Sequence, residues 1–278
     1  MRKRKYSITQ AKKDLPRRLK HDNKTRGGKC LVIAGAEGQW GAAVLCAKAA
    51  ARMGAGYTYI YDFKKSFPTL KFPDFLINSK QKDFSKFNSI AIGPGVKDQA
   101  FLNKCILQLK KIGHPSVVLD AEAINTLAKQ KKKFKLPSSW IMTPHEGEAA
   151  GLLEISSDDV RADRESTVQK IQKQWDCIVV LKGADTLVAN EKNLFQIQSG
   201  NSALAKAGTG DVLTGIITGL LSQNLPASKA ACLGVFIHGF IADLWIQNKN
   251  DQLSLIASDL IDHLPKTLSQ IRTMNSAK

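Results

Sequence analysis

The feature that most constrains the fold is a repeated pattern of short apolar runs that end in small or charged residues. Four such runs occupy residues 30–34, 89–92, 117–119 and 177–181, and glycine, aspartate or a Lys-Gly pair follows each one. Continuous apolar runs of this length are typical of strands buried on both faces, as in parallel sheets. The carboxyl ends of parallel strands share one edge, so we expect a ligand crevice along that edge.

Helix-forming segments alternate with these runs and complete the pattern. Helices are expected at residues 41–53, 98–111, 121–128, 159–174, 227–247 and 253–271. A further strand is expected at 57–61, and a hairpin is expected from 186–189 and 194–198. The sequence therefore predicts an α/β fold whose central, mostly parallel sheet carries helices on both faces. A length of 278 residues with 43% hydrophobic content fits one large domain.

The positive charge of the chain is concentrated at its beginning. Residues 1–29 contain twelve Lys and Arg against two Asp, which is +10 of the total of +17. We therefore divide the chain into a basic, solvated tail at 1–27 and a domain at 28–278, and expect that removal of residues 1–26 leaves folding and catalysis nearly intact. No zinc-finger or helix-turn-helix spacing supports a specific nucleic-acid role.

The remaining composition indicates a cytoplasmic protein that is not inserted in a membrane. The basic start lacks the apolar core of a secretory signal. Polar residues and Pro226 interrupt the longest uncharged run, 212–228, which favours a buried helix, and Gly215 and Gly219 in it favour close helix packing. The five cysteines form no CxxC pair and lie in apolar surroundings, as reduced core thiols do.

The segment with the clearest chemical pattern is 201–211, which ends in Gly208-Thr-Gly-Asp211 and continues into the apolar helix expected from residue 212. Glycines at 208 and 210 let backbone N–H groups converge ahead of a helix N-terminus, which suits an anion. Thr209 or Asp211 could cap the helix. One interpretation is a turn with an N-cap; the other is that Asp211 acts as a general base beside a phosphate group.

Three other turns contain candidate binding residues. In residues 140–148, Thr143 is expected to cap a helix with Glu146 as its capping-box partner, which would place His145 in the first turn, facing the crevice. His145 could instead be structural. Lys182 ends a strand beside Gly183, where it could meet a phosphate or lie in solvent. The turn at 35–41 matches neither the dinucleotide-binding nor the P-loop pattern, but small residues at 41–42 allow a ligand close approach.

Taken in order, six segments resemble the ADP/ATP-dependent NAD(P)H-hydrate dehydratases, which have a ribokinase-like fold. The resemblance covers about residues 28–270 and rests on Ala34-Gly35 with Gly41-Ala42, Ile92-Gly-Pro-Gly95, Leu119-Asp-Ala121, Thr143-Pro-His-Glu-Gly-Glu148, Val180-Leu-Lys-Gly183, and Gly200-Asn201 through Gly208-Thr-Gly-Asp211.

The resemblance implies a substrate, a reaction and site residues. The substrate would be the S form of NADH or NADPH hydrated at C6 (NADHX or NADPHX). Its hydroxyl would receive the terminal phosphoryl group of ADP or ATP and then leave as phosphate, with Mg²⁺ bridging the nucleotide phosphates. Asp211 stands at the position of the family's catalytic base. Ala42, Gly95, His145 and Asp211 resemble the positions that contact the hydrate. The residues that resemble the nucleotide-contacting positions are Lys182, Gly183, Ala184, Asp185, Thr186, Gly208, Thr209 and Gly210. No protein ligand for a metal is assigned.

Several expectations and alternatives accompany this resemblance. Ala207 and Lys97 stand where relatives usually have glycine. Residues 1–27 are too few for the epimerase domain of many relatives, so we expect a separate epimerase, ADP rather than ATP as donor, and a homo-oligomer such as a tetramer. One alternative is a small-molecule kinase of the same fold, of the hydroxyethylthiazole-kinase type. The other is a basic nucleic-acid-binding protein with a vestigial enzyme fold.

Overall fold

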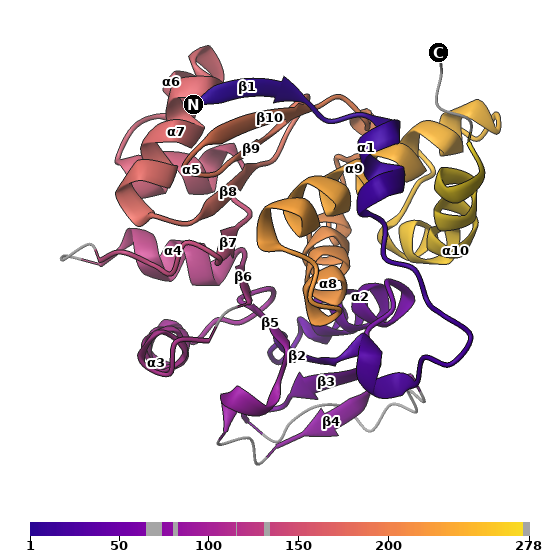
Figure 1. Cartoon of the computed structure of the whole chain (residues 1–278). Helices are drawn as coiled ribbons and strands as arrows, with labels where there is room; N and C mark the ends of the chain where they lie inside the picture. Colours follow the sequence, from indigo (N-terminus) through magenta and orange to yellow (C-terminus); the bar gives the residue numbers. More distant parts are fainter. Residues whose placement is uncertain (65–73, 80–82, 115, 131–133, 275–278) are drawn as a thin grey trace.

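A ten-stranded sheet forms the centre of the computed structural model, which describes residues 1–64, 74–79, 83–114, 116–130 and 134–274 (Figure 1). Its strands, in chain order, are β1 (Arg2–Lys5), β2 (Lys29–Ile33), β3 (Tyr57–Tyr61), β4 (Leu76–Asn78), β5 (Ser89–Ile92), β6 (Val117–Leu119), β7 (Ile141–Met142), β8 (Ile178–Leu181), β9 (Thr186–Ala189) and β10 (Asn193–Ile197). Their order across the sheet is β1-β10-β9-β8-β7-β6-β5-β2-β3-β4. Neighbouring strands are parallel except that β9 runs antiparallel to β8 and β10. The predicted, mostly parallel sheet is confirmed.

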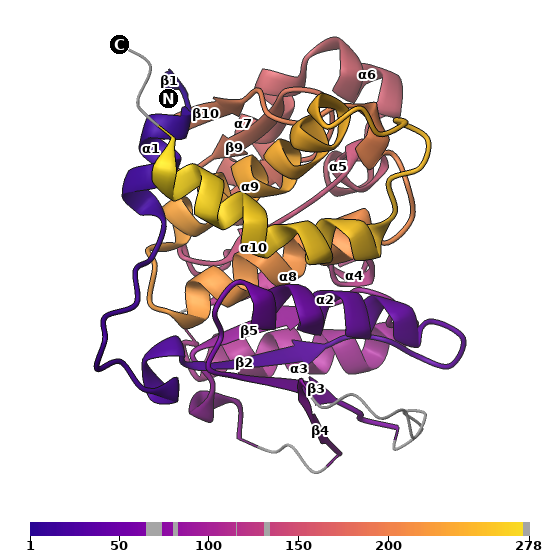
Figure 2. The ribbon, with the colours of Figure 1, turned by 90° about the vertical axis from the view of Figure 1, so that its right-hand side faces the viewer.

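Helices cover both faces of this sheet (Figures 1 and 2). One face carries α1 (Ile8–Asp14), α2 (Trp40–Arg52), α8 (Thr209–Ser222), α9 (Ala227–Gln247) and α10 (Ala257–Thr273). The other carries α3 (Gln99–Lys111), α4 (Glu122–Ala128), α5 (Glu146–Leu153), α6 (Ser157–Ala162) and α7 (Arg164–Trp175). Successive strand residues point to opposite faces, so Val118 packs in the α8 and α9 layer and Leu119 packs in the α3 and α4 layer.

Helix α8 packs closely against α2, as the spacing of Gly215 and Gly219 predicted. A Cβ atom on Gly215 would lie 2.2 Å from the carbonyl oxygen of Cys46, and one on Gly219 would lie 2.5 Å from that of Ala50. Any larger side chain at either position would push the two helices apart. This contact holds the N-terminus of α8 at the carboxyl edge of the sheet.

Helix α9 is long and apolar enough, by length and composition alone, to cross a membrane. Its residues Leu233, Ile237 and Ile241 have no exposed surface and belong to the core shared with α8 and α10. Burial inside the fold therefore accounts for its apolar composition. The five cysteines, all in the described part of the chain, are free thiols and buried, as predicted.

The expectation that residues 1–27 form a solvated tail is wrong. Strand β1 pairs in parallel with β10 at the edge of the sheet. Tyr6, Ala11 and Leu15 are 7%, 0% and 4% exposed and belong to the core beneath α9 and α10. The four side chains of β1 are basic and exposed because an edge strand is held by its backbone hydrogen bonds.

Two predicted helix boundaries also require correction. The helix expected at 159–174 is divided into α6 and α7 at Asp163, whose carboxylate accepts a hydrogen bond from the N–H of Ser166 and caps α7. The last helix begins at Ala257 rather than at 253, because the preceding residues form a turn around Asp251. In both places an aspartate side chain accepts a hydrogen bond from a nearby main-chain N–H group, which interrupts the helical pattern locally.

Candidate functional site

The first turn of α8 is open at its N-terminus. Gly208 occupies the N-cap position with φ of 89°, and no side chain caps this helix in the described structure. A Cβ on Gly208 would lie 2.8 Å from Leu45 and 3.0 Å from Ala257, so both the conformation and the space require glycine. The Thr209 hydroxyl donates to the carbonyl oxygens of Leu204 and Lys206 instead of capping. Neither Thr209 nor Asp211 is therefore the cap, and the helix N-terminus is available to an anion.

A buried network of charged and polar groups lies behind this turn. Lys182, at the end of β8, donates to Oδ1 of Asp120 at 2.9 Å, and its Nζ lies 3.8 Å from Oε2 of Glu148. The other oxygen of Asp120 accepts from the Thr214 hydroxyl at 2.8 Å. Thr214 and Asp211 both belong to α8, so the network ties this helix to the ends of β6 and β8. Asp120, Glu148 and Thr214 were not among the predicted site residues.

The electrostatics of the network make Asp211 a suitable proton acceptor. Burial of the carboxylate, together with the nearby charge of Asp120, raises the pKa of Asp211 to about 7, and Lys182 opposes this shift. Burial alone would lower the pKa of Lys182, but Asp120 and Glu148 outweigh it and raise that pKa, so Lys182 remains a cation. A carboxylate that titrates near pH 7 can take a proton and release it in one catalytic cycle.

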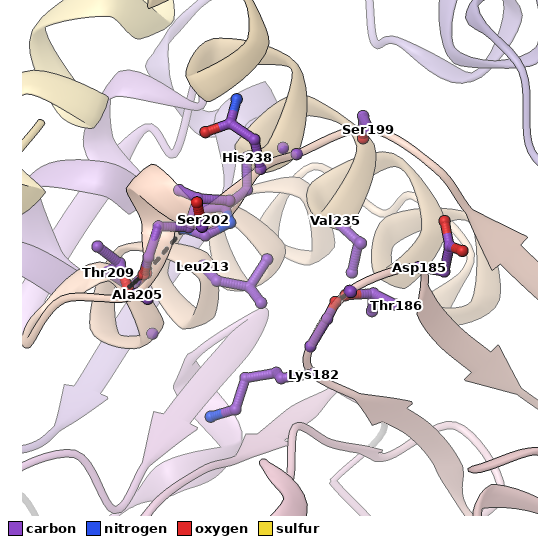
Figure 3. Close-up of a pocket in the computed structure, with 17 residues that line it drawn as sticks. Lys182, Asp185, Thr186, Ser199, Ser202, Ala205, Thr209, Leu213, Val235 and His238 are labelled. Atoms are coloured by element: carbon purple, nitrogen blue, oxygen red, sulfur yellow. Dashed lines mark hydrogen bonds between the residues drawn. The ribbon is translucent and has the colours of Figure 1, made fainter. Parts of the chain in front are cut away.

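A cavity of about 520 Å³ opens on one side of this turn (Figure 3). Its lining contains seven of the eight predicted nucleotide-contacting residues, namely Lys182, Gly183, Ala184, Asp185, Thr186, Thr209 and Gly210. The eighth, Gly208, directly precedes Thr209 in the turn. The cavity also contains polar residues that the prediction did not include, among them Ser199, Asn201, Ser202 and His238. Asn201 begins the 201–211 segment that the sequence analysis singled out. No sequence pattern marked His238 as a site residue.

A second hollow, of about 320 Å³, lies on the other side of the network and contains Gly95, Lys97 and Glu148. The methyl group of Ala42 lies 3.0 Å from the position that a Cβ on Gly95 would take, so these two predicted hydrate-contacting residues are neighbours. The Lys182–Glu148 contact joins this hollow to the larger cavity. Asp211 acts electrostatically on Lys182, and therefore belongs to the same junction.

His145 has a role that the sequence assigned to Thr143. Its Nδ1 accepts from the N–H groups of Gly147 and Glu148, and Glu148 accepts from the N–H of His145, which is a capping box. Helix α5 therefore begins at Glu146, two residues later than predicted, and the Thr143 hydroxyl instead donates to Leu119. The His145 side chain is 60% exposed, and its Nε2 lies 3.5 Å from Oε1 of Glu148. Contact with a hydrate stays a prediction for this residue.

The side chains around these two hollows bear on whether the protein itself could hold a metal ion. Within the described ranges, no three His, Cys, Asp or Glu side chains converge as a metal cage. The large cavity offers hydroxyl groups, amides and Lys182, which suit phosphate oxygens. Mg²⁺ commonly enters such sites on nucleotide phosphates and keeps several water ligands, so this donor set fits a magnesium–nucleotide complex bound as a substrate.

Comparison with known proteins places this geometry in a family. A sequence model of the NAD(P)H-hydrate dehydratase family matches residues 30–266. The bifunctional NAD(P)H-hydrate repair enzyme of Vibrio cholerae is 36% identical over 263 residues, 92% of this chain and 52% of that protein. The ADP-dependent (S)-NAD(P)H-hydrate dehydratase of Neisseria meningitidis is 34% identical over 256 residues, 87% of this chain and 86% of that protein. The chain thus spans about half the length of the bifunctional relatives.

Solved structures agree with this assignment. The ADP/ATP-dependent NAD(P)H-hydrate dehydratase of Bacillus subtilis, co-crystallized with ATP and Mg²⁺, superimposes with a TM-score of 0.85 at 28% identity, covering 96% of this chain and 98% of that one. Hydroxyethylthiazole kinase of Pyrococcus horikoshii has a TM-score of 0.62 at 15% identity, covering 93% and 92% of the two chains, and shares the fold alone. A family match over most of the sequence, together with two relatives above 30% identity, shows that the chain belongs to the NAD(P)H-hydrate dehydratase family.

Proposed function

We propose that this protein dehydrates the S form of hydrated NADH or NADPH back to NAD(P)H at the expense of a nucleotide, with ADP as the phosphoryl donor. The observation that carries the proposal is the placement of Asp211. This carboxylate has a pKa of about 7, lies in the first turn of an uncapped helix, and adjoins a nucleotide-sized cavity. A base and an anion site at one point are what phosphoryl transfer to a hydroxyl group requires.

In the proposed reaction, Asp211 takes the proton of the C6 hydroxyl group while that oxygen attacks the terminal phosphorus of ADP. The new O–P bond forms as the bond to the bridging oxygen breaks, which releases AMP. The N–H groups at the open end of α8 stabilise the negative charge on the phosphoryl oxygens. Phosphate then leaves C6 and a proton leaves C5, which restores the double bond. Lys182 balances the negative charge beside the phosphates and stays held by Asp120.

The choice of ADP over ATP rests on the names of relatives. The Neisseria protein, which this chain matches over most of both lengths, is called ADP-dependent. The Bacillus protein is called ADP/ATP-dependent and was co-crystallized with ATP and Mg²⁺. Mg²⁺ would arrive with the nucleotide and neutralise part of its phosphate charge.

The cellular setting is part of the same proposal. Two relatives that this chain matches over most of their length are named as dehydratases alone, which supports an epimerase on a separate protein. A cytoplasmic location belongs to the proposal, and the free, buried thiols support it. A homo-oligomer remains our expectation. The kinase alternative is supported by the shared fold alone.

A single assay tests the proposal. Purified protein is mixed with chemically hydrated NADPH, Mg²⁺ and either ADP or ATP, and the absorbance of the dihydronicotinamide band is followed with phosphate release. We expect one phosphate for each NADPH regenerated, and faster turnover with ADP. Nucleotide-dependent phosphorylation that leaves a stable phosphorylated product, without NADPH, would establish a kinase instead.

A further inference from the structure

One buried side chain in the wall of the large cavity is not used by the proposed reaction. His238, on α9, is 8% exposed and lines the cavity together with Thr209 (Figure 3). Its Nε2 lies 2.9 Å from the carbonyl oxygen of Thr209. A carbonyl oxygen only accepts hydrogen bonds, so Nε2 must carry the hydrogen atom. The main chain of α8 therefore selects one tautomer of the ring.

The selected tautomer determines what the second ring nitrogen can do. Burial, reinforced by the positive charge of Lys182, lowers the pKa of His238 to about 4, although the bond to Thr209 opposes the shift. The ring is therefore neutral at pH 7, and Nδ1 carries a lone pair without a hydrogen atom. Among the residues that the structure describes, none donates a hydrogen bond to Nδ1. Because the ring lines the cavity, a donor to Nδ1 can come from a bound ligand or from water.

We propose that Nδ1 of His238 accepts a hydrogen bond from a ribose hydroxyl group of the nucleotide, which makes His238 a specificity-determining residue for ribonucleotides. This inference rests on the proposed function, because it assumes that a nucleotide fills this cavity. Phosphate oxygens are acceptors and cannot serve Nδ1. The donors of a nucleoside diphosphate are its two ribose hydroxyl groups and the amino group of its base.

The position of His238 along the cavity favours the ribose over the base. The ring is bonded to Thr209, the first residue of the helix whose N-terminus would receive the phosphates. The ribose is the part of the nucleotide joined directly to the phosphate chain, whereas the base lies one further unit away. A neutral histidine at this place can also accept a hydrogen bond from the ribose without adding positive charge to that of Lys182.

Binding measurements without hydrate test this inference apart from catalysis. Calorimetry compares ADP, 2′-deoxy-ADP, 3′-deoxy-ADP and inosine diphosphate on the wild type, on His238→Gln and on His263→Gln. Glutamine retains an N–H that can reach Thr209, and when this N–H takes the place of the ring Nε2–H, the amide oxygen points away from the position of Nδ1. His263, whose Nδ1 bonds to the Asp259 carbonyl outside the cavity, provides a matched control.

We expect the wild type and His263→Gln to bind one of the two deoxy analogues about three- to tenfold more weakly than ADP, as the loss of one neutral hydrogen bond predicts. His238→Gln should bind ADP more weakly by a similar factor and should no longer distinguish it from that analogue. If His238→Gln does not fold, the wild type still tests the inference, because equal affinity for ADP and both deoxy analogues would overturn it.

Four results would overturn the inference. The wild type could bind both deoxy analogues as tightly as ADP, or His238→Gln could retain the full discrimination. A loss of affinity confined to inosine diphosphate would assign the base amino group to Nδ1. Absence of ADP binding to the wild type would reject the nucleotide cavity, and the proposed function with it, whereas binding without discrimination would reject the inference alone.

Discussion

At the scale of single residues, the chemistry depends on how one carboxylate is surrounded. Asp211 is half-buried, and its burial together with the negative charge of Asp120 raises its pKa. The positive charge of Lys182 offsets only part of this rise in pKa. An exposed aspartate would be ionised at neutral pH and would be a weak base. Burial beside a second carboxylate makes Asp211 a stronger one. The same surroundings make its ionisation unfavourable for the folded state.

The first prediction concerns the role of this carboxylate. Asp211→Asn keeps the size of the side chain and should retain nucleotide binding, but it removes the base, so we expect turnover to fall by about 10²- to 10⁴-fold. Steady-state rates with hydrated NADPH and ADP, and calorimetry with ADP alone, measure the two effects. Turnover near the wild-type rate would mean that Asp211 is not the base.

The second prediction concerns pH. Because Asp211 must be ionised to accept a proton, kcat/KM should rise with pH through an apparent pKa of about 7. Since its pKa is raised on folding, its protonated form contributes stability that is fully present below about pH 4 and is lost as the pH rises through about 7. Asparagine does not titrate, so Asp211→Asn does not lose this stability as the pH rises. Denaturant unfolding should therefore show the variant gaining stability relative to the wild type from pH 4 to pH 8; a constant difference would contradict the raised pKa.

The third prediction separates two roles of His145. Because its ring caps α5, His145→Ala should lower the free energy of unfolding by about 1 kcal/mol, besides raising the KM for the hydrate if the ring contacts it. His145→Asn restores a capping oxygen. We expect this variant to recover the melting temperature while its KM stays raised. A normal KM in both variants would leave His145 with the capping role alone.

At the scale of elements, the basic N-terminal segment is part of the fold. Helices α2 and α8 end close to it: Arg18 donates to the carbonyl oxygen of Gly54, just past α2, and Ser222 at the end of α8 donates to that of Gly27. Arg272, in the last turn of α10, donates to the carbonyl oxygen of Pro16. Helix C-termini carry partial negative charge, which favours Arg18 at the end of α2, and hydrogen bonds tie the ends of α8 and α10 to the same segment.

The fourth prediction reverses the expectation for a tail. Removal of residues 1–15 exposes the core around α10 and the edge of β10, so we expect a loss of about 3 kcal/mol or more in the free energy of unfolding. The matched control replaces the four basic residues of β1 with glutamine and should stay near the wild-type stability, because the backbone pairing is kept. Equal stability of the truncated protein would restore the tail interpretation.

At the scale of the whole molecule, the site joins both halves of the sequence. Asp120 follows β6, Glu148 lies in α5, Lys182 follows β8, and Thr214 and Asp211 lie in α8, yet one network connects them. The sheet achieves this because its parallel strands end at one edge. A ligand at this edge would contact elements from both core layers and should stabilise the chain as a unit.

The fifth prediction follows from this connection. ADP with Mg²⁺ at a concentration 100 times its dissociation constant should raise the free energy of unfolding by about 2.7 kcal/mol, since it binds the folded chain alone. Thermal unfolding followed by calorimetry should show one transition that moves upward with ADP concentration. A transition that does not move would exclude binding at this edge.

Local patterns in the sequence were sufficient for the buried strands, the helices between them and the site at the carboxyl edge. Apolar runs of strand length and glycines at turns depend on residues that are near one another in the chain, so they can be read without the fold. The same holds for Gly215 and Gly219, whose small size serves close packing. The nucleotide-contacting residues were implied by the family resemblance, and seven of them line one cavity.

Tertiary contacts decided the rest. Strand β1 could not be predicted because the backbone of β10, far along the chain, holds it while its side chains are all basic. The pairing of Lys182 with Asp120, the raised pKa of Asp211 and the tautomer of His238 each require groups separated by 29 or more residues to meet in a buried space. Sequence determined which residues stand at the ends of strands and helices, whereas burial and charge at the assembled edge decided their protonation, because both depend on neighbours that only folding brings together.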